Sequence, residues 1–159
     1  MSVLNNASAF RNAILGGVPV LKSTGTLAAT TVDLFVIAGG EVMVTALWGK
    51  VTTSITVANA YYLKVTPTTG DASQLCVATD IGATDTVAGG ILGFGLGSTT
   101  APPKLMSPSA SSNVSWPGPL PQIVVPTGKI QSVSAGTDGV ISWYCTWVPL
   151  TDGATLVAA

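Results

Sequence analysis

Alternation of apolar and polar residues with a period of two is the feature that most constrains this chain. The clearest example runs from Ile141 to Trp147, where apolar side chains fill every second position and serine, tyrosine and threonine lie between them. Successive side chains of a β-strand point to opposite faces, so this pattern predicts a half-buried strand. Almost no pattern with the helical period follows residue 16. The chain is therefore expected to be all-β.

Similar runs recur along the chain with turn residues between them. They predict eight to ten short strands, within residues 27–37, 42–57, 61–65, 75–79, 86–96, 130–134 and 139–148. Gly49-Lys50 interrupts the second run, which predicts either a hairpin or one long bent strand. The turn residues 135–138 predict a hairpin between the last two runs. Many short strands of this kind favour an antiparallel β-sandwich or a jelly-roll.

Two segments do not follow the alternation. A length of 159 residues suits one domain, and we expect residues 18–159 to form it, preceded by an N-terminal arm of residues 1–17 with one or two helical turns. Within the domain, residues 98–121 hold six prolines among many serines. Proline removes a hydrogen bond from a sheet, so this stretch is expected to be a long surface loop. Trp116 in the loop either anchors it on a neighbouring molecule or folds back on its own sandwich.

Charge and histidine content exclude several function classes. Charged residues make up 8% of the chain, with a net charge of −1, so no basic field is available to bind nucleic acid. No stretch has the roughly 20 consecutive apolar residues of a membrane-spanning helix. The chain has no histidine, the commonest general base and metal ligand. We therefore expect neither an enzyme nor a partner among nucleic acids and membranes.

Motifs for chemistry are scarce. Asp80 and Asp85 could hold a hard cation through their oxygens, but acidic turn residues are common and the spacing matches no calcium loop. The glycine-rich residues 89–97 lack the Gly-Lys-Ser/Thr ending of a phosphate-binding loop, which favours a strand or loop. Cys76 and Cys145 are expected to be buried, reduced thiols. The sequence thus suggests no catalytic, cofactor-binding or metal-ligating residue.

The aromatic residues offer one binding alternative. Several of them on one outward face would form a platform on which sugars stack, as in a carbohydrate-binding module. However, Trp143 and Trp147 share a strand face with Ile141 and Cys145, which is the pattern of an inner, core-facing surface. The interpretation as core is therefore preferred, and a glycan partner stays an alternative.

Composition also bears on self-association. Hydrophobic residues make up 47% of the chain and mean hydropathy is +0.56, with very little charge to cover the surface. A monomer of this composition would expose large uncharged areas, which favours association. We therefore expect a subunit whose surface is partly covered by copies of itself or by a larger assembly.

Three stretches resemble small β-rich structural proteins from the virions of tailed bacteriophages. The resemblance covers about Thr26 to Ala159, in three parts: a strand-glycine-strand opening over Val32–Val57, the stretch LCVATDI over Leu75–Ile81, and a tryptophan-containing strand that leads into PLTDGA over Ser142–Ala154. It implies a non-enzymatic part of the virion, assembled in the host cytoplasm. A capsid decoration protein that reinforces contacts between capsomers, often as a trimer, is the expected role. The same three stretches resemble tail or head-fibre components almost as closely.

The resemblance also implies partners. We expect contacts with other copies of the chain, as a homotrimer, and with the major capsid protein or other virion subunits, and no cofactor. The predicted contact residues are Phe10, Ile14 and Leu15 in the arm and Trp116 in the loop. Because few charges are available, such contacts are expected to be mainly apolar and only weakly sensitive to salt.

Overall fold

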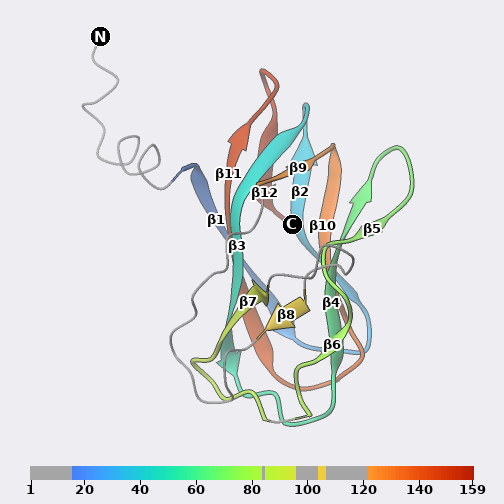
Figure 1. Cartoon of the computed structure of the whole chain (residues 1–159), viewed down its shortest axis with the longest axis vertical. Coiled ribbons are helices and arrows are strands. Elements are labelled where there is room, and N and C mark those ends of the chain that lie inside the picture. The colour runs from blue at the N-terminus through green and yellow to red at the C-terminus, as the bar shows by residue number, and fades with distance from the viewer. Residues whose placement is uncertain (1–15, 84, 96–103, 107–121) are drawn as a thin grey trace, which may run out of the picture.

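The computed structural model describes residues 16–83, 85–95, 104–106 and 122–159, and within these ranges it is built from strands arranged in two sheets (Figure 1). Sheet A contains β1 (Val18–Thr26), β3 (Val42–Thr53), β7 (Ile91–Gly95), β8 (Lys104–Met106), β9 (Ile123–Val125) and β11 (Val140–Pro149). Sheet B contains β2 (Thr31–Ala38), β4 (Ala60–Pro67), β5 (Ser73–Gln74), β6 (Thr79–Asp80), β10 (Gly128–Ser134) and β12 (Thr155–Ala158). The expected all-β, antiparallel β-sandwich is confirmed.

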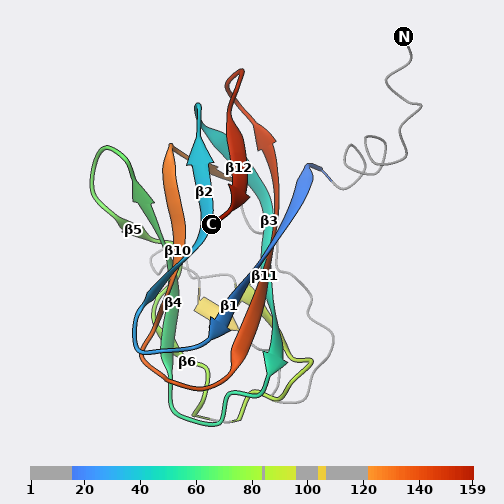
Figure 2. The ribbon, with the colours of Figure 1, turned by 180° about the vertical axis from the view of Figure 1, so that it is seen from behind.

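Long strands form the centre of each sheet. In sheet A the order is β1-β11-β3-β7-β8, with β9 pairing the first residues of β3. In sheet B the order is β12-β2-β10-β4-β5, with β6 pairing the first residues of β4. The described pairs within both sheets are antiparallel. Figure 2 shows the opposite side, where β1 and β12 lie at the margins of their sheets.

The core fills the space between the sheets, because alternate residues of both sheets face inward. In β11 the buried positions are Ile141, Trp143, Cys145 and Trp147, as the alternation predicted. Trp143 of sheet A donates a hydrogen bond from Nε1 to the hydroxyl of Tyr61 in sheet B, at 2.8 Å. The two rings are parallel, with centroids 6.2 Å apart. Both large polar-tipped residues are therefore fully buried with their polar atoms paired, as burial requires.

The predicted hairpin between residues 130–134 and 139–148 is wrong. Strand β10 pairs with β2 and β4 in sheet B, whereas β11 pairs with β1 and β3 in sheet A. The connection between them crosses from one sheet to the other. A buried side chain fixes this crossing: Asn59 accepts hydrogen bonds at Oδ1 from Ser134 Oγ and from the backbone N–H groups of Ala135 and Gly136. The turn residues therefore mark a change of sheet.

Gly49-Lys50 marks neither a hairpin nor a chain reversal, because β3 continues through both residues. Gly49 faces the core, where a Cβ atom would lie 3.0 Å from Ile141 Cγ2 and 3.2 Å from the Trp143 ring. The glycine thus makes room for Trp143. Of the two alternatives left open by the sequence, the long strand is confirmed.

Two other predictions change in detail. The short strand expected over residues 75–79 is divided, since β5 and β6 both pair with β4 and the chain between them turns Cys76 into the core. Cys76 Sγ accepts a hydrogen bond from the Leu63 N–H at 3.3 Å. The segment expected to be a loop over residues 98–121 contains β8, which pairs with β7. Its remaining residues, like the arm up to Leu15, lie outside the described ranges.

Candidate functional site

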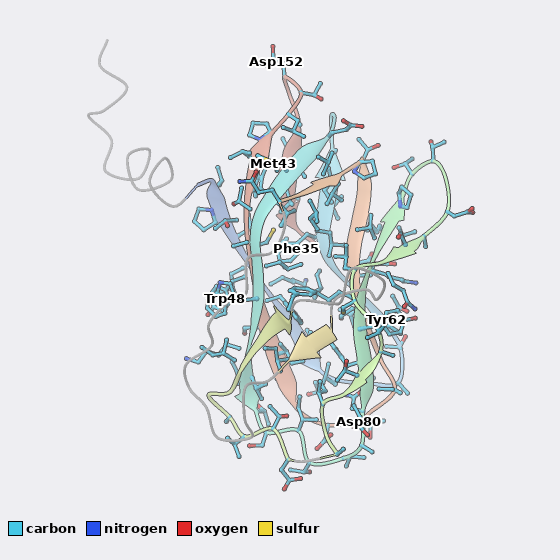
Figure 3. All side chains as sticks on the ribbon, in the orientation of Figure 1. Phe35, Met43, Trp48, Tyr62, Asp80 and Asp152 are labelled. Atoms are coloured by element: carbon cyan, nitrogen blue, oxygen red, sulfur yellow. The ribbon has the colours of Figure 1, made fainter. Side chains whose placement is uncertain are left out.

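The outer face of sheet A carries aromatic and aliphatic side chains among serines and threonines, whereas a solvated sheet face is mainly polar. We call this surface the A face. In Figure 3, Trp48 and Met43 lie on the side of β3 away from Phe35, which is inside the sandwich. The burial alternation of β1, β3, β9 and β11 assigns the A face these outward residues: Pro19, Leu21, Ser23, Met43, Thr45, Trp48, Lys50, Thr52, Val124, Ser142, Tyr144, Thr146 and Val148. Lys50 is the single charged residue among them.

An aromatic pair occupies the middle of the A face. Tyr144 of β11 is the register partner of Trp48 of β3 and of Leu21 of β1, so the three side chains form one row across three strands. The Trp48 and Tyr144 rings stack with centroids 4.0 Å apart and an angle of 5° between their planes. Leu21 remains 52% exposed and Val124, farther along the face, 57%. The row is rigid and largely uncharged, which are properties of contact surfaces.

A hollow of about 480 Å³ lies at the end of the A face where β1 begins. Its volume falls within the range of ligand-binding pockets. No acidic or basic residue is among those that line it: Gly16, Gly17, Val18, Met43, Thr45, Gln122, Trp147, Val148 and Pro149. Gly17 has φ +150°, and a Cβ there would collide with the backbone of Trp147, so only glycine allows this close approach.

The rim of the hollow is also where the chain enters the described structure. Gly16 follows residues 1–15, and Gln122 follows residues 107–121; both line the hollow. The predicted contact residues Phe10, Ile14, Leu15 and Trp116 all belong to these two segments and lie outside the described residues. The structure therefore places the attachment points of both segments at one hollow, although not the four side chains themselves.

The outer face of sheet B, by contrast, carries a polar network. Lys129 and Asp33 form an ion pair at 2.6 Å. Gln131 donates from Nε2 to Asp33 Oδ1 at 2.5 Å and accepts at Oε1 from Thr66 Oγ1 at 2.7 Å. The hydrogen bond from Gln131, followed by that from Lys129, lowers the pKa of Asp33 below its usual value. This face satisfies its polar groups within one chain.

Of the two carboxylates considered for a cation, Asp80 is bound by backbone N–H groups in a loop and Asp85 is exposed. Asp80 Oδ1 accepts hydrogen bonds from the backbone N–H groups of Asn59, Gly82 and Ala83 at 2.8–2.9 Å. Asp138 Oδ2 accepts from the backbone N–H and the hydroxyl of Thr56. In both cases the backbone donor is the main cause of a lowered pKa. Asp80 and Asp138 thus hold the β3–β4 connection from either side.

Other chemical groups offer little reactivity in the described part of the chain. Cys76 and Cys145 are free and buried, as predicted, and burial raises the pKa of Cys145 to about 12. A thiol with so high a pKa is a poor nucleophile. The described residues include no group of three His, Cys, Asp or Glu side chains that could hold a metal ion. Among them no helix is long and apolar enough to cross a membrane.

Sequence reasoning missed the A face and its hollow. The alternation in β3 and β11 identified the inward residues. The outward residues Met43, Trp48 and Tyr144 were a usable signal, because large aromatic and apolar side chains are uncommon at the outward positions of a solvated face. Which outward residues lie side by side depends on strand register, which the sequence did not supply. Comparisons with protein-family models, with curated proteins and with solved structures find no match for this chain.

Proposed function

We propose that the chain is a non-enzymatic structural subunit of a bacteriophage virion, which decorates or reinforces the capsid surface and associates with other copies of itself and with the major capsid protein. The observation that carries the proposal is the A face. It presents Leu21, Trp48, Tyr144 and Val124 beside a hollow whose described lining has no charged residue, while the opposite outer face carries the Asp33–Lys129 ion pair and its hydrogen bonds. The virion setting itself comes from the sequence resemblance.

The chemistry of the A face suits a repeated, weakly charged contact. An ordinary stable interface buries about 800 Å² on each partner and places aromatic residues near its centre. In a shell, each subunit makes several such contacts at once, so a weak single contact is multiplied by avidity. A stacked Trp–Tyr pair is already ordered before association, which reduces the entropy that an interface loses on binding.

Light scattering behind a sizing column tests the self-association directly. We expect the full chain to form a multimer, with three copies as the expected number, and Leu21→Lys to dissociate it. Val157 is 53% exposed on β12 of sheet B, against 52% for Leu21, so Val157→Lys is a matched control that should leave the multimer intact. A monomeric full chain, or equal effects of the two lysines, would count against the A face as the contact.

Co-sedimentation tests the capsid partner. Shells assembled from a phage major capsid protein without decoration proteins are pelleted with the chain, and binding is measured with and without Leu21→Lys. Retention of the unchanged chain and loss of the variant support the proposal. If neither chain sediments with head shells but both bind purified tails, the tail or fibre assignment replaces the capsid assignment.

A second candidate function, carbohydrate binding, is favoured by the half-buried Trp48–Tyr144 pair alone. Aromatic rings stack against the apolar faces of sugars. Because the two rings stack on each other at 4.0 Å, each has only one free face for a sugar. Titration of oligosaccharides under tryptophan fluorescence decides this alternative, with a saturable change that Trp48→Ala removes as the supporting result.

A further inference from the structure

The hollow of the A face is open at the end of the sandwich, and the structure supplies a segment of suitable chemistry at its rim. The lining has no Asp, Glu, Lys or Arg, and its apolar side chains come from β1, β3 and β11. The fifteen residues that precede Gly16 include Phe10, Ile14 and Leu15 and one charged side chain, Arg11. An uncharged hollow and a nearly uncharged apolar segment match each other, since neither has to desolvate a charge on contact.

The direction of the chain at this point favours a partner over the same copy. β1 pairs with β11 on one side only and forms the margin of sheet A, and its first residues lie at the outer edge of the ribbon (Figure 2). The contact between Gly17 and the backbone of Trp147 fixes the path of the chain there. The point at which residues 1–15 join the described structure therefore lies at the margin of sheet A, where a neighbouring copy is accessible.

The length of the segment agrees with this direction. Fifteen residues can reach about 50 Å when extended, whereas a domain of this size has a radius of gyration of about 15 Å. Filling a hollow that begins at Gly16 needs only the last few residues of such a segment. A reach several times larger suits a hollow on a neighbouring copy.

We propose that the A-face hollow is the docking site for residues 1–15 of a second copy of this chain, which places Phe10, six residues before Gly16, against Met43, Val148 and Pro149. The inference rests on the proposed function, because it requires copies side by side. Each copy then inserts its residues 1–15 into one neighbour and binds the same residues of another neighbour in its own hollow. Such head-to-tail contacts close into rings when the rotation between copies permits. A trimer would be one such ring.

Mixed disulfide trapping tests the exchange. A Phe10→Cys chain is mixed with a Val148→Cys chain, oxidised mildly, and the two-chain product is measured on a non-reducing gel; Met43→Cys serves as a second acceptor position. Phe10→Cys mixed with Val157→Cys, on sheet B, is the matched control. We expect the two-chain product with either A-face cysteine to exceed the control at least about tenfold, because a docked segment raises the effective concentration of its thiol.

A doubly substituted chain, Phe10→Cys with Val148→Cys, separates docking on a second copy from docking within one chain. A link that closes within single chains, with no two-chain product, would overturn the second copy as the donor. Yields equal to the control at both acceptor positions would overturn the docking site itself. Filling the hollow by Thr45→Trp should lower the two-chain yield about tenfold, as expected for loss of a buried apolar contact, while circular dichroism verifies that the variant folds.

Light scattering on the same samples keeps the two proposals apart. A multimer that Leu21→Lys dissociates, together with control-level trapping, would refute the docking of residues 1–15 and leave the proposed function standing. A chain that stays monomeric at all concentrations and binds no capsid shell would refute both.

Discussion

The two outer faces of this sandwich are built on the same strand alternation and differ in what the outward positions carry. Sheet B places Asp33, Lys129 and Gln131 next to one another, and their ion pair and hydrogen bonds are completed within the chain. Sheet A places Trp48 against Tyr144 and leaves Leu21 half exposed. The polar groups of the sheet B network are paired within the chain, whereas the aromatic row of sheet A has apolar surface that would gain free energy from being covered.

Because the faces differ only at outward positions, the association of the chain can be tested separately from the stability of its fold. Both inner faces contribute to one core, across which Trp143 bonds to Tyr61, so the core itself does not distinguish the two sheets. Substitutions on the outward positions can therefore test association without removing core contacts. Added charge on the A face should weaken association, whereas salt and pH should change the free energy of unfolding more than association.

The largest expected effect is the loss of association when a charge enters the aromatic row. Trp48→Lys removes the stacked ring and places an ammonium group at the centre of the A face, and we expect the multimer to weaken about 100-fold, the scale of an interface hot spot. Tyr62→Lys is the matched control, because Tyr62 is a half-buried aromatic residue on the outer side of sheet B (Figure 3). Sedimentation over a range of concentrations measures both. Equal weakening by the two variants would remove the distinction between the faces.

The next effect concerns stability alone. Asn59→Ala deletes the Oδ1 acceptor that serves Ser134, Ala135 and Gly136. Leaving these donors unpaired should lower the free energy of unfolding by about 2 kcal/mol. Chemical denaturation measures the loss, and the multimer mass at low denaturant should stay unchanged. A variant as stable as the unchanged chain would show that the sheet crossing does not depend on this residue.

Much of the fold could be predicted because alternation reports burial directly. The inward set of β11, from Ile141 to Trp147, followed from period alone. The predicted connection between the last two long strands, a hairpin, was wrong. Residues 135–138 have the composition of a hairpin turn, yet the strands on either side belong to different sheets, because Asn59, more than seventy residues earlier, binds the connection. A contact between residues so far apart in sequence leaves no local pattern.

Gly49 illustrates a related difficulty. Glycine within a strand pattern is compatible with a turn, with a bulge or with close packing. Here the cause is the ring of Trp143 on the neighbouring strand, which fills the space that a side chain would take. The candidate site had the same obstacle, since Leu21, Tyr144 and Trp48 become one row only through the register of three strands. The predicted contacts Phe10, Ile14, Leu15 and Trp116 stay predictions.

A smaller effect is expected from the ion pair of sheet B. Lys129→Met removes the partner of Asp33, and because both side chains are partly exposed, unfolding free energy should fall by only about 0.5 kcal/mol at low salt and by less at high salt. Denaturation at two salt concentrations measures the change. The multimer formed through the A face should respond little to the same salt, since Lys50 is its one charged residue. Dissociation by moderate salt would contradict an apolar contact.

The smallest effect at neutral pH, and the one that best separates the faces, comes from acid. Asp33, Asp80 and Asp138 each have a lowered pKa, through Gln131, the Asn59 N–H and the Thr56 N–H respectively. A carboxyl group whose pKa is lower in the folded chain stabilises the fold fully above its unfolded pKa of about 4, and this contribution is lost as pH falls through the folded value.

Tm should therefore be constant between about pH 7 and pH 5 and decline below about pH 4. Asp80→Asn should reduce the decline, because the amide cannot be protonated in this range. The described residues of the A face include no Asp or Glu, so the mass of the multimer should stay constant while Tm begins to fall. Dissociation that precedes the fall in Tm would place a titrating group in the contact and argue against the A face as its site.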